Sequence, residues 1–87
     1  MRQSGSMIHG VTEPITLVKQ NGERFDGIAH VQPNFILSEE ANMPFEENDI
    51  IERTLPNGLT EQFLILDRGF WSANHHMPAH YQIKGVN

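Results

Sequence analysis

The stretch DIIERTLPNGLTEQFLILD, residues 49–67, decides the fold that we predict for this chain. Large apolar and β-branched residues lie on both sides of Pro56-Asn57-Gly58, a pattern that predicts two strands joined by a tight turn. A two-residue loop would place Pro56 at a ladder position, where proline has no N–H to donate. A three-residue loop places Pro56 in a type I turn and Gly58 in the left-handed conformation, and we therefore predict this loop.

The three-residue loop also sets the register of the hairpin. It places oppositely charged residues and pairs of apolar residues across from one another, and such cross-strand pairs stabilise a sheet. Because Ile65 and Leu66 are both apolar, we expect the end of the second strand to be covered on both faces. The predicted partners are Leu55 with Leu59, Thr54 with Thr60, Arg53 with Glu61, and Ile51 with Phe63.

A second hairpin is predicted nearer the N-terminus. Residues 15–19 are rich in strand-forming residues, Asn21-Gly22 is a turn signal, and the apolar residues of 24–32 alternate as in a returning strand. The alternation slips by one position near Gly27, which predicts a bulge or a bend there.

The rest of the chain is predicted to hold one helical turn, two loops and a last strand. Residues 38–42 have the pattern of a single helical turn, with Ser38 as the N-cap and acids in the first turn. We expect residues 43–49 to form a polar loop that carries two residues of buried type and has solvated acidic residues. We expect residues 68–78 to form the longest irregular loop. Residues 79–86 alternate as a strand. Its predicted outward residues are His80, Gln82 and Lys84, and its predicted inward residues are Tyr81 and Ile83.

Short strands with regularly spaced turn signals, and no amphipathic helix, predict an all-β fold. We expect a small antiparallel β-barrel or a rolled sheet of five to six short strands. The 87 residues suffice for one domain. We assign residues 8–87 to this domain and interpret residues 1–7 as a disordered leader or tag remnant, since Met7 is a possible second start.

Composition limits the classes of partner. The chain contains no cysteine, which excludes disulfides and thiolate metal sites and suits a cytoplasmic location. Its 11 acidic and 6 basic residues give a formal charge of −5, which opposes general binding to nucleic-acid backbones. No apolar run approaches the roughly 20 residues of a membrane-spanning helix. We therefore expect a cytoplasmic protein that binds neither nucleic acid nor membrane.

The aromatic residues of the 68–78 loop are the strongest candidates for a contact surface. Trp71, the only tryptophan in the chain, follows Phe70 and lies close to Arg68. Aromatic residues and arginine are enriched at interface hot spots. The alternative is that one ring closes an open end of the barrel, because neighbouring side chains in an extended segment point in opposite directions. Both interpretations stay open.

Three histidines, His75, His76 and His80, lie near these aromatic residues in the sequence, and imidazole is a good ligand for zinc, nickel or copper. Adjacent residues tend to point apart, however, and no carboxylate is placed by its spacing to orient the rings. We predict no metal site and no cofactor. A small-ligand or metal-binding barrel that uses the 68–80 loop remains the alternative function.

No catalytic motif is recognised in the sequence. Ser72, Asp67 and the histidines lack the surroundings of a nucleophile elbow, so we predict a protein that is not an enzyme and assign no catalytic residue. A single-stranded nucleic-acid binder is a weaker alternative. Phe70, Trp71 and Tyr81 offer rings on which bases stack, but the basic residues do not cluster.

The run IIERTLPNGLTEQFLILDRGFW…MPAHYQIK, from Ile50 to Lys84, resembles small uncharacterised proteins of bacterial and mobile-element genomes, of the integron gene-cassette or prophage type. This resemblance brings no known activity with it. The order of an acidic Asn-Asp step, a strand, a turn and a strand ending in Asp is also similar to phage head–tail connector barrels. The second resemblance implies a structural protein that acts as a ring.

These patterns together predict a non-enzymatic interaction or structural module that self-associates as a homo-oligomer, with a possible protein partner. Edge strands of so small a sheet leave backbone groups unpaired, and pairing with a second subunit satisfies those groups. The residues predicted to form the interface or ligand loop are Arg68, Phe70, Trp71, His75, His76, His80 and Tyr81.

Overall fold

The computed structural model of the protein describes residues 12–87. Within this range it contains seven β-strands and no helix. The predicted all-β fold is therefore confirmed. The assignment of residues 1–7 to a leader, and of residue 8 to the start of the domain, lies outside the described residues. The strands are β1 (Glu13–Val18), β2 (Arg24–Val31), β3 (Ile36–Ser38), β4 (Ile50–Thr54), β5 (Thr60–Asp67), β6 (Phe70–Trp71) and β7 (His80–Val86).

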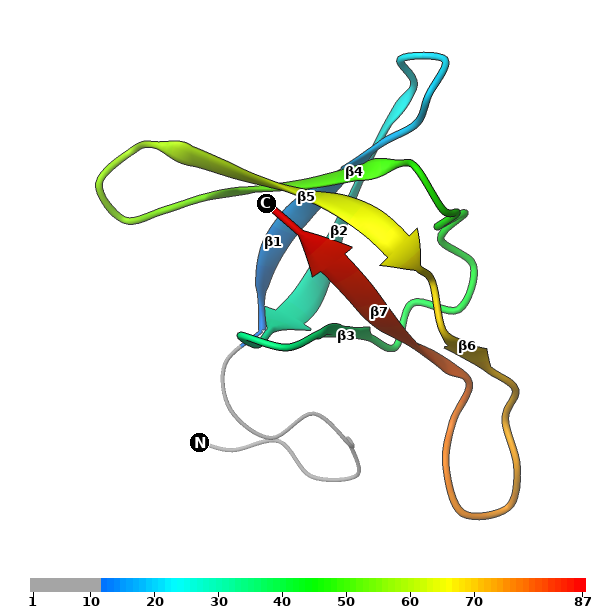
Figure 1. Ribbon diagram of the computed structural model, residues 1–87. Helices are drawn as coiled ribbons and strands as arrows, with labels where there is room; N and C mark the ends of the chain where they lie inside the picture. Colours follow the sequence, from blue (N-terminus) through cyan, green and yellow to red (C-terminus); the bar gives the residue numbers. More distant parts are fainter. Residues whose placement is uncertain (1–11) are drawn as a thin grey trace.

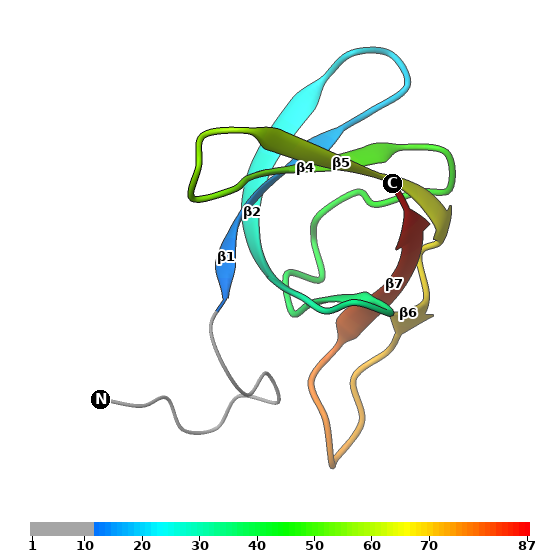
Figure 2. The ribbon, with the colours of Figure 1, turned by 60° about the vertical axis from the view of Figure 1, so that its left-hand side comes forward.

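Six of these strands close into an antiparallel barrel, in the order β1-β2-β3-β7-β5-β4 and back to β1. Figure 2 shows the ring that they form. The seventh strand, β6, follows β5 after a short break and pairs with β7, so it extends the wall at one end of the barrel (Figure 1). In the described part of the chain, β6 is the one strand with a single partner strand. Closure gives every barrel strand two partner strands, although some ladders cover only part of a strand, so among the described strands β6 is the one whose whole outer edge is unpaired.

The β4–β5 hairpin has the predicted three-residue loop. Arg53 lies opposite Glu61, and the Leu55 N–H donates a hydrogen bond of 2.8 Å to the carbonyl of Leu59. Gly58 has a φ of 88°, the left-handed conformation that the turn requires and that glycine adopts without strain. The remaining predicted partners are observed as well: Thr54 with Thr60, and Ile51 with Phe63.

The β1–β2 hairpin is confirmed, and of the two alternatives predicted near Gly27, a bulge or a bend, the structure has no bulge. The two strands pair without a register shift along the whole of β1. β2 bends instead, because its first part pairs with β1 whereas His30 and Val31 pair with β3.

Gly27 has a different reason to be a glycine. A Cβ at this position would overlap the carboxylate of Glu40. That carboxylate accepts a hydrogen bond of 2.7 Å from the N–H of Ile28. The loop after β3 therefore covers part of the β2 edge that no strand pairs.

The bulge of this barrel lies in β5. The register between β5 and β7 shifts between Ile65, opposite Gly85, and Asp67, opposite Lys84, so that Leu66 is the extra residue. Leu66 is 53% exposed, and the expectation that this end of the strand is covered on both faces is wrong. The extra residue turns Asp67 onto the outer face beside Lys84, in the way that bulges re-aim side chains.

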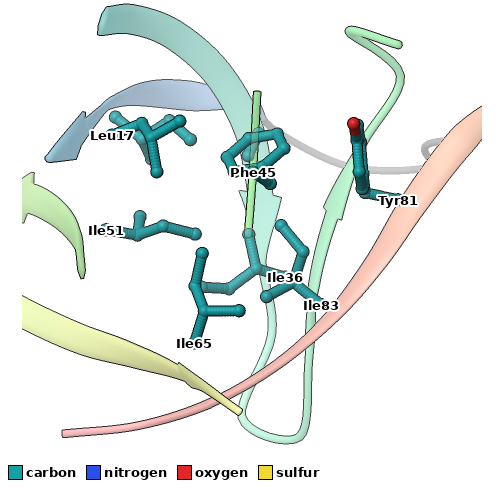
Figure 3. Packing of buried hydrophobic residues seen from close by; sticks show 9 residues of the cluster. Leu17, Ile36, Phe45, Ile51, Ile65, Tyr81 and Ile83 are labelled. Carbon is teal, nitrogen blue, oxygen red and sulfur yellow. The ribbon is translucent and has the colours of Figure 1, made fainter. Parts of the chain in front are cut away.

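One apolar core fills the barrel, and the loop between β3 and β4 supplies its centre. Phe45, from this loop, is fully buried among side chains that come from several strands (Figure 3). Tyr81 packs edge-on against Phe45, with ring centroids 4.8 Å apart, and its hydroxyl donates to the Met43 carbonyl at 2.8 Å. Because side chains fill the interior, the surfaces open to a ligand or a partner lie on the outside of the barrel. The other core residues are Ile15, Leu17, Ala29, Ile36, Ile51, Ile65 and Ile83.

The segment after β3 contains turns in place of the predicted helical turn. Ser38 pairs with Tyr81 in the β3–β7 ladder, so it ends a strand and does not begin a helix. Its hydroxyl still accepts a hydrogen bond from the N–H of Glu40 at 3.2 Å. The Met43 N–H then donates to the Glu40 carbonyl at 3.0 Å, which closes a turn.

Asp49 is also not solvated as expected, because its side chain is 1% exposed. Its Oδ2 lies 2.5 Å from the Nζ of Lys19, which also donates to Glu46 at 2.9 Å and to the Pro44 carbonyl at 2.6 Å. Burial lowers the pKa of Lys19, but hydrogen bonds to Asp49 and Glu46 outweigh burial and leave the pKa above its ordinary value of 10.5. The pair ties the loop that carries Phe45 to the end of β1.

Candidate functional site

A groove of about 400 Å³ lies on the outer face of the barrel, over β7 and its neighbours. Ligand pockets of small molecules begin at roughly this volume. We call this feature the outer groove. Its lining residues are Asn34, Phe35, Asp67, Gly69, Trp71, Gln82 and Lys84.

Strand alternation explains why these residues meet. Residues two apart on a strand share a face, and residues opposite one another on neighbouring strands lie side by side. Three residues from the β5–β6 segment accordingly share the outer face with their neighbours on β7: Asp67 with Lys84, Gly69 with Gln82, and Trp71 with His80.

Trp71 forms one end of the outer groove, and 56% of it is exposed. Its indole is parallel to the ring of His80, with 1° between the planes and 6.1 Å between the centroids. His80 has the predicted direction but is only 1% exposed, so it is not a surface ligand contact. The Nδ1 of His80 lies 2.9 Å from the Pro78 carbonyl, while its Nε2 has no partner among the described residues. Stacking on this buried ring holds Trp71 as a flat platform.

Gly69 forms the floor of the outer groove. Its φ of 55° is left-handed, its N–H donates to the Asp67 carboxylate at 2.9 Å, and its carbonyl accepts from the Gln82 N–H at 2.9 Å. A Cβ at this position would overlap the carbonyl oxygen of Gln82. The position therefore requires glycine, and no side chain fills the space between Trp71 and Asp67.

Phe70 lies on the other side of β6 from Trp71, as neighbouring residues of a strand do. Its ring packs on Tyr81 with 4.9 Å between centroids, yet Phe70 is 46% exposed. Tyr81 is a core residue at 7% exposure, so it is not available as a surface contact. The ring that plugs the barrel is Phe45, and both Phe70 and Trp71 remain open to solvent.

The outer edge of β6 presents the backbone of Phe70. The carbonyl of Gly69 accepts from the N–H of Gln82, and Trp71 lies opposite His80. Hydrogen-bonded and non-hydrogen-bonded pairs alternate along an antiparallel ladder. The Trp71–His80 pair is therefore the hydrogen-bonded one, and the N–H and C=O of Phe70 point away from β7.

The loop between β6 and β7 carries His75 and His76, which are both exposed and have ring centroids 4.1 Å apart. The side chain of Asn74 orders this loop by accepting a hydrogen bond of 2.7 Å from the His76 N–H. Because His80 is buried, the three histidines do not converge. In the part of the chain that the structure describes, no group of three or more His, Cys, Asp or Glu residues is placed to hold a metal ion.

Three of the polar side chains at the outer groove have no partner within the described chain. Asn34, Gln82 and Lys84 form no side-chain hydrogen bond or ion pair with residues 12–87. The side chain of Arg68 forms none either, although its backbone N–H donates to Glu47 at 2.9 Å. This hydrogen bond lowers the pKa of the Glu47 carboxyl.

The sequence predictions identify the aromatic residues of this region but miss the outer groove. Gln82 and Lys84 are predicted to face outward, yet nothing in the sequence connects them to Trp71. Asp67 joins them through the bulge at Leu66, and an apolar run that ends in Asp gives no signal for a bulge. The alternation of the last strand is the one pattern that predicts lining residues as outward-facing, and it predicts two of the seven, Gln82 and Lys84.

Comparison with protein-family models, curated proteins and solved structures found no match to this chain. The resemblances to mobile-element proteins and to phage connector barrels therefore stay predictions. Among the described residues there is no helix with the length and apolar character needed to cross a membrane.

Proposed function

We propose that the protein is a non-catalytic interaction module that self-associates through β6. The observation that carries this proposal is the open edge of β6, which bears the exposed ring of Phe70. An open strand edge is a template for pairing with another chain, and exposed aromatic rings are typical anchors of interfaces.

The geometry of β6 favours a symmetric contact between two copies. The N–H and C=O of Phe70 point outward together, so two antiparallel β6 strands satisfy both groups reciprocally around a two-fold axis. The same arrangement brings the two Phe70 rings side by side, as a cross-strand aromatic pair. Pairing of this kind gives β6, which has a single partner strand in the described chain, a second partner strand.

The charge distribution near β6 also supports association. A formal charge of −5 opposes contact between two copies of the chain. Arg68, two residues before Phe70, has no ion pair in the described chain, but it interacts electrostatically with the Glu46 and Glu47 carboxylates, so its positive charge offsets only part of that repulsion. A self-associating cytoplasmic module of this kind suits the mobile-element or phage-like assembly role predicted from the sequence resemblance.

Sedimentation equilibrium of Phe70→Lys beside wild type tests the proposal. A lysine on an edge strand opposes edge-to-edge pairing, and loss of an aromatic anchor weakens an interface by roughly tenfold or more. Leu59→Lys is the matched control, because Leu59 is 63% exposed at the tip of the β4–β5 hairpin. We expect association of wild type and of the control, and a loss of affinity in Phe70→Lys alone.

Two results would contradict this function. One is a wild type that stays monomeric at the highest soluble concentration, and the other is equal weakening by both lysine variants. Phe70→Ala provides a second test in case lysine disturbs the packing on Tyr81, with circular dichroism to show that each variant is folded.

A further inference from the structure

We propose that the outer groove binds a neutral saccharide, with a pyranose ring stacked on Trp71. This site is separate from the self-association surface, because Trp71 and Phe70 lie on opposite sides of β6. Pairing of two β6 edges leaves the outer face of each barrel open. The two proposals therefore stand or fall independently.

The platform sets the shape of the ligand. Trp71 is more than half exposed although it is the largest apolar side chain of the region, and its stacking on His80 fixes the plane of the indole. A flat apolar surface favours a ligand with a flat apolar face. A pyranose has such a face, formed by its C–H groups, and carries hydroxyls around its rim.

The polar groups around the platform match those hydroxyls. The amides of Asn34 and Gln82 each donate and accept, Lys84 donates, and Asp67 accepts. Asn34, Gln82 and Lys84 have no partner within residues 12–87, and one Asp67 oxygen already receives the Gly69 N–H. A hydroxyl also donates and accepts, so a ring of such groups can bind several hydroxyls at once.

The charge of the outer groove points to a neutral ligand. Asp67 and Lys84 face each other across β5 and β7, so their charges largely cancel. A nucleotide base could stack on Trp71, but its phosphate would meet Asp67 on a chain of charge −5. Phe35 supplies a second apolar wall, which suits the C–H groups of a sugar better than an anion.

A larger hollow on the opposite face is a weaker candidate. It measures about 630 Å³, but four of its polar side chains bind one another in two pairs. Thr16 donates to Asp26 at 3.0 Å, and Arg24 pairs with Glu52 at 2.6 Å. Binding a ligand there would require breaking these contacts, whereas Asn34, Gln82 and Lys84 at the outer groove have no side-chain partner among residues 12–87.

Tryptophan fluorescence tests the proposal directly, because Trp71 is the only tryptophan of the chain. The probes are cellotriose, chitotriose and maltotriose, with adenosine monophosphate as the nucleotide probe. For an open groove of this size we expect a saturable shift of the emission with at least one trisaccharide, at a Kd of about 1 mM. The titrations are run on wild type and on Phe70→Lys, so that loss of self-association does not alter the outcome.

Three substitutions locate the site, and a fourth is the matched control. Gln82→Ala and Lys84→Met should each weaken saccharide binding about tenfold, because each removes a polar partner of the hydroxyls. Gln62→Ala removes the same amide from the opposite face, where Gln62 already donates to Glu52 at 2.8 Å, and should leave binding unchanged. Trp71→Ala should abolish binding. Because this variant lacks the fluorophore, its binding is measured by ligand-detected NMR.

Three outcomes would overturn the proposal. The first is no fluorescence change with any of the trisaccharides up to about 20 mM. The second is an equal affinity in wild type, Gln82→Ala and Lys84→Met. The third is tighter binding of adenosine monophosphate than of the saccharides, which would assign the groove to nucleotides.

Discussion

On the face formed by β1, β2, β4 and β5, many polar side chains bind one another, whereas at the outer groove the side chains of Asn34, Gln82 and Lys84 bind nothing in the described chain. Glu52 shows the first behaviour, since it accepts from Arg24 at 2.6 Å and from Gln62 at 2.8 Å. Gln82 and Lys84 show the second. Two faces of one barrel thus use the same residue types differently.

The contrast separates residues that hold the fold from residues that are available for contact. Paired side chains across neighbouring strands fix the register and satisfy one another. Unpaired polar side chains beside an exposed indole and an exposed phenyl ring do not contribute to the barrel in this way. These side chains can therefore bind a ligand or a second copy of the chain without a loss in the free energy of unfolding.

The largest difference in stability is expected between two lysine substitutions, one at a paired lysine and one at an unpaired lysine. Lys19→Met leaves Asp49 buried without its cation, and we expect a loss of about 3 kcal/mol in the free energy of unfolding. Lys84→Met removes a lysine without an ion pair in the described chain and should change stability by less than about 0.5 kcal/mol. Urea denaturation measures both, and equal losses would break the distinction.

Arg53 gives a test at intermediate size. Its side chain binds Glu61 at 2.7 Å and Glu13 at 2.9 Å, and it lies over the ring of Phe63 at 5.8 Å. Arg53 and its two charged partners are all partly exposed, so Arg53→Met should cost about 1 kcal/mol. Arg68→Met is the matched control, and thermal denaturation should show no comparable loss for it.

Alkaline pH should weaken the fold through Lys19 by a smaller amount. Its folded pKa is raised above 10.5, because hydrogen bonds to Asp49 and Glu46 outweigh the opposing effect of burial. A raised folded pKa contributes stability that is fully present below the unfolded value and is lost as pH rises through the folded value. The melting temperature of wild type should therefore fall more steeply above pH 10.5 than that of Lys19→Met. Parallel curves would show that Lys19 does not carry this dependence.

The smallest effects distinguish two glutamines on the opposite faces. Gln62→Ala removes a hydrogen bond to Glu52 and should cost about 0.5–1 kcal/mol. Gln82→Ala removes an amide without a side-chain partner in the described chain and should cost less than Gln62→Ala. Chemical denaturation of the two variants side by side measures the difference, and the reverse order would contradict the account.

The fold was largely predictable because its signals are local. Pro56-Asn57-Gly58 specifies one loop, and that loop fixes the whole β4–β5 ladder. The alternation of the last strand likewise predicts that Ile83 faces inward and Gln82 outward. Turn chemistry and period-two alternation involve near neighbours in the chain, so the sequence displays them directly.

The candidate site was less predictable because contacts between distant segments build it. The same holds outside the outer groove: the buried carboxylate of Asp49 binds Lys19, which lies 30 residues away in the sequence, and no local pattern predicts that pair. Leu66 is exposed because β5 bulges where it pairs with β7. His80 is hidden although alternation gives it an outward direction. In each case tertiary packing overrides a correct local rule.

The most direct test of the account is a dilution series of amide NMR spectra on isotopically labelled wild type. In the proposed dimer, β6 forms the contact surface, and the face formed by β1, β2, β4 and β5 makes no contact with the second copy. We expect concentration-dependent shifts at Phe70 and its neighbours in β6, with none in β1 or β4. Shifts that concentrate on β1, β2 or β4, or spectra unchanged up to about 1 mM, a concentration at which even weak complexes form, would contradict it.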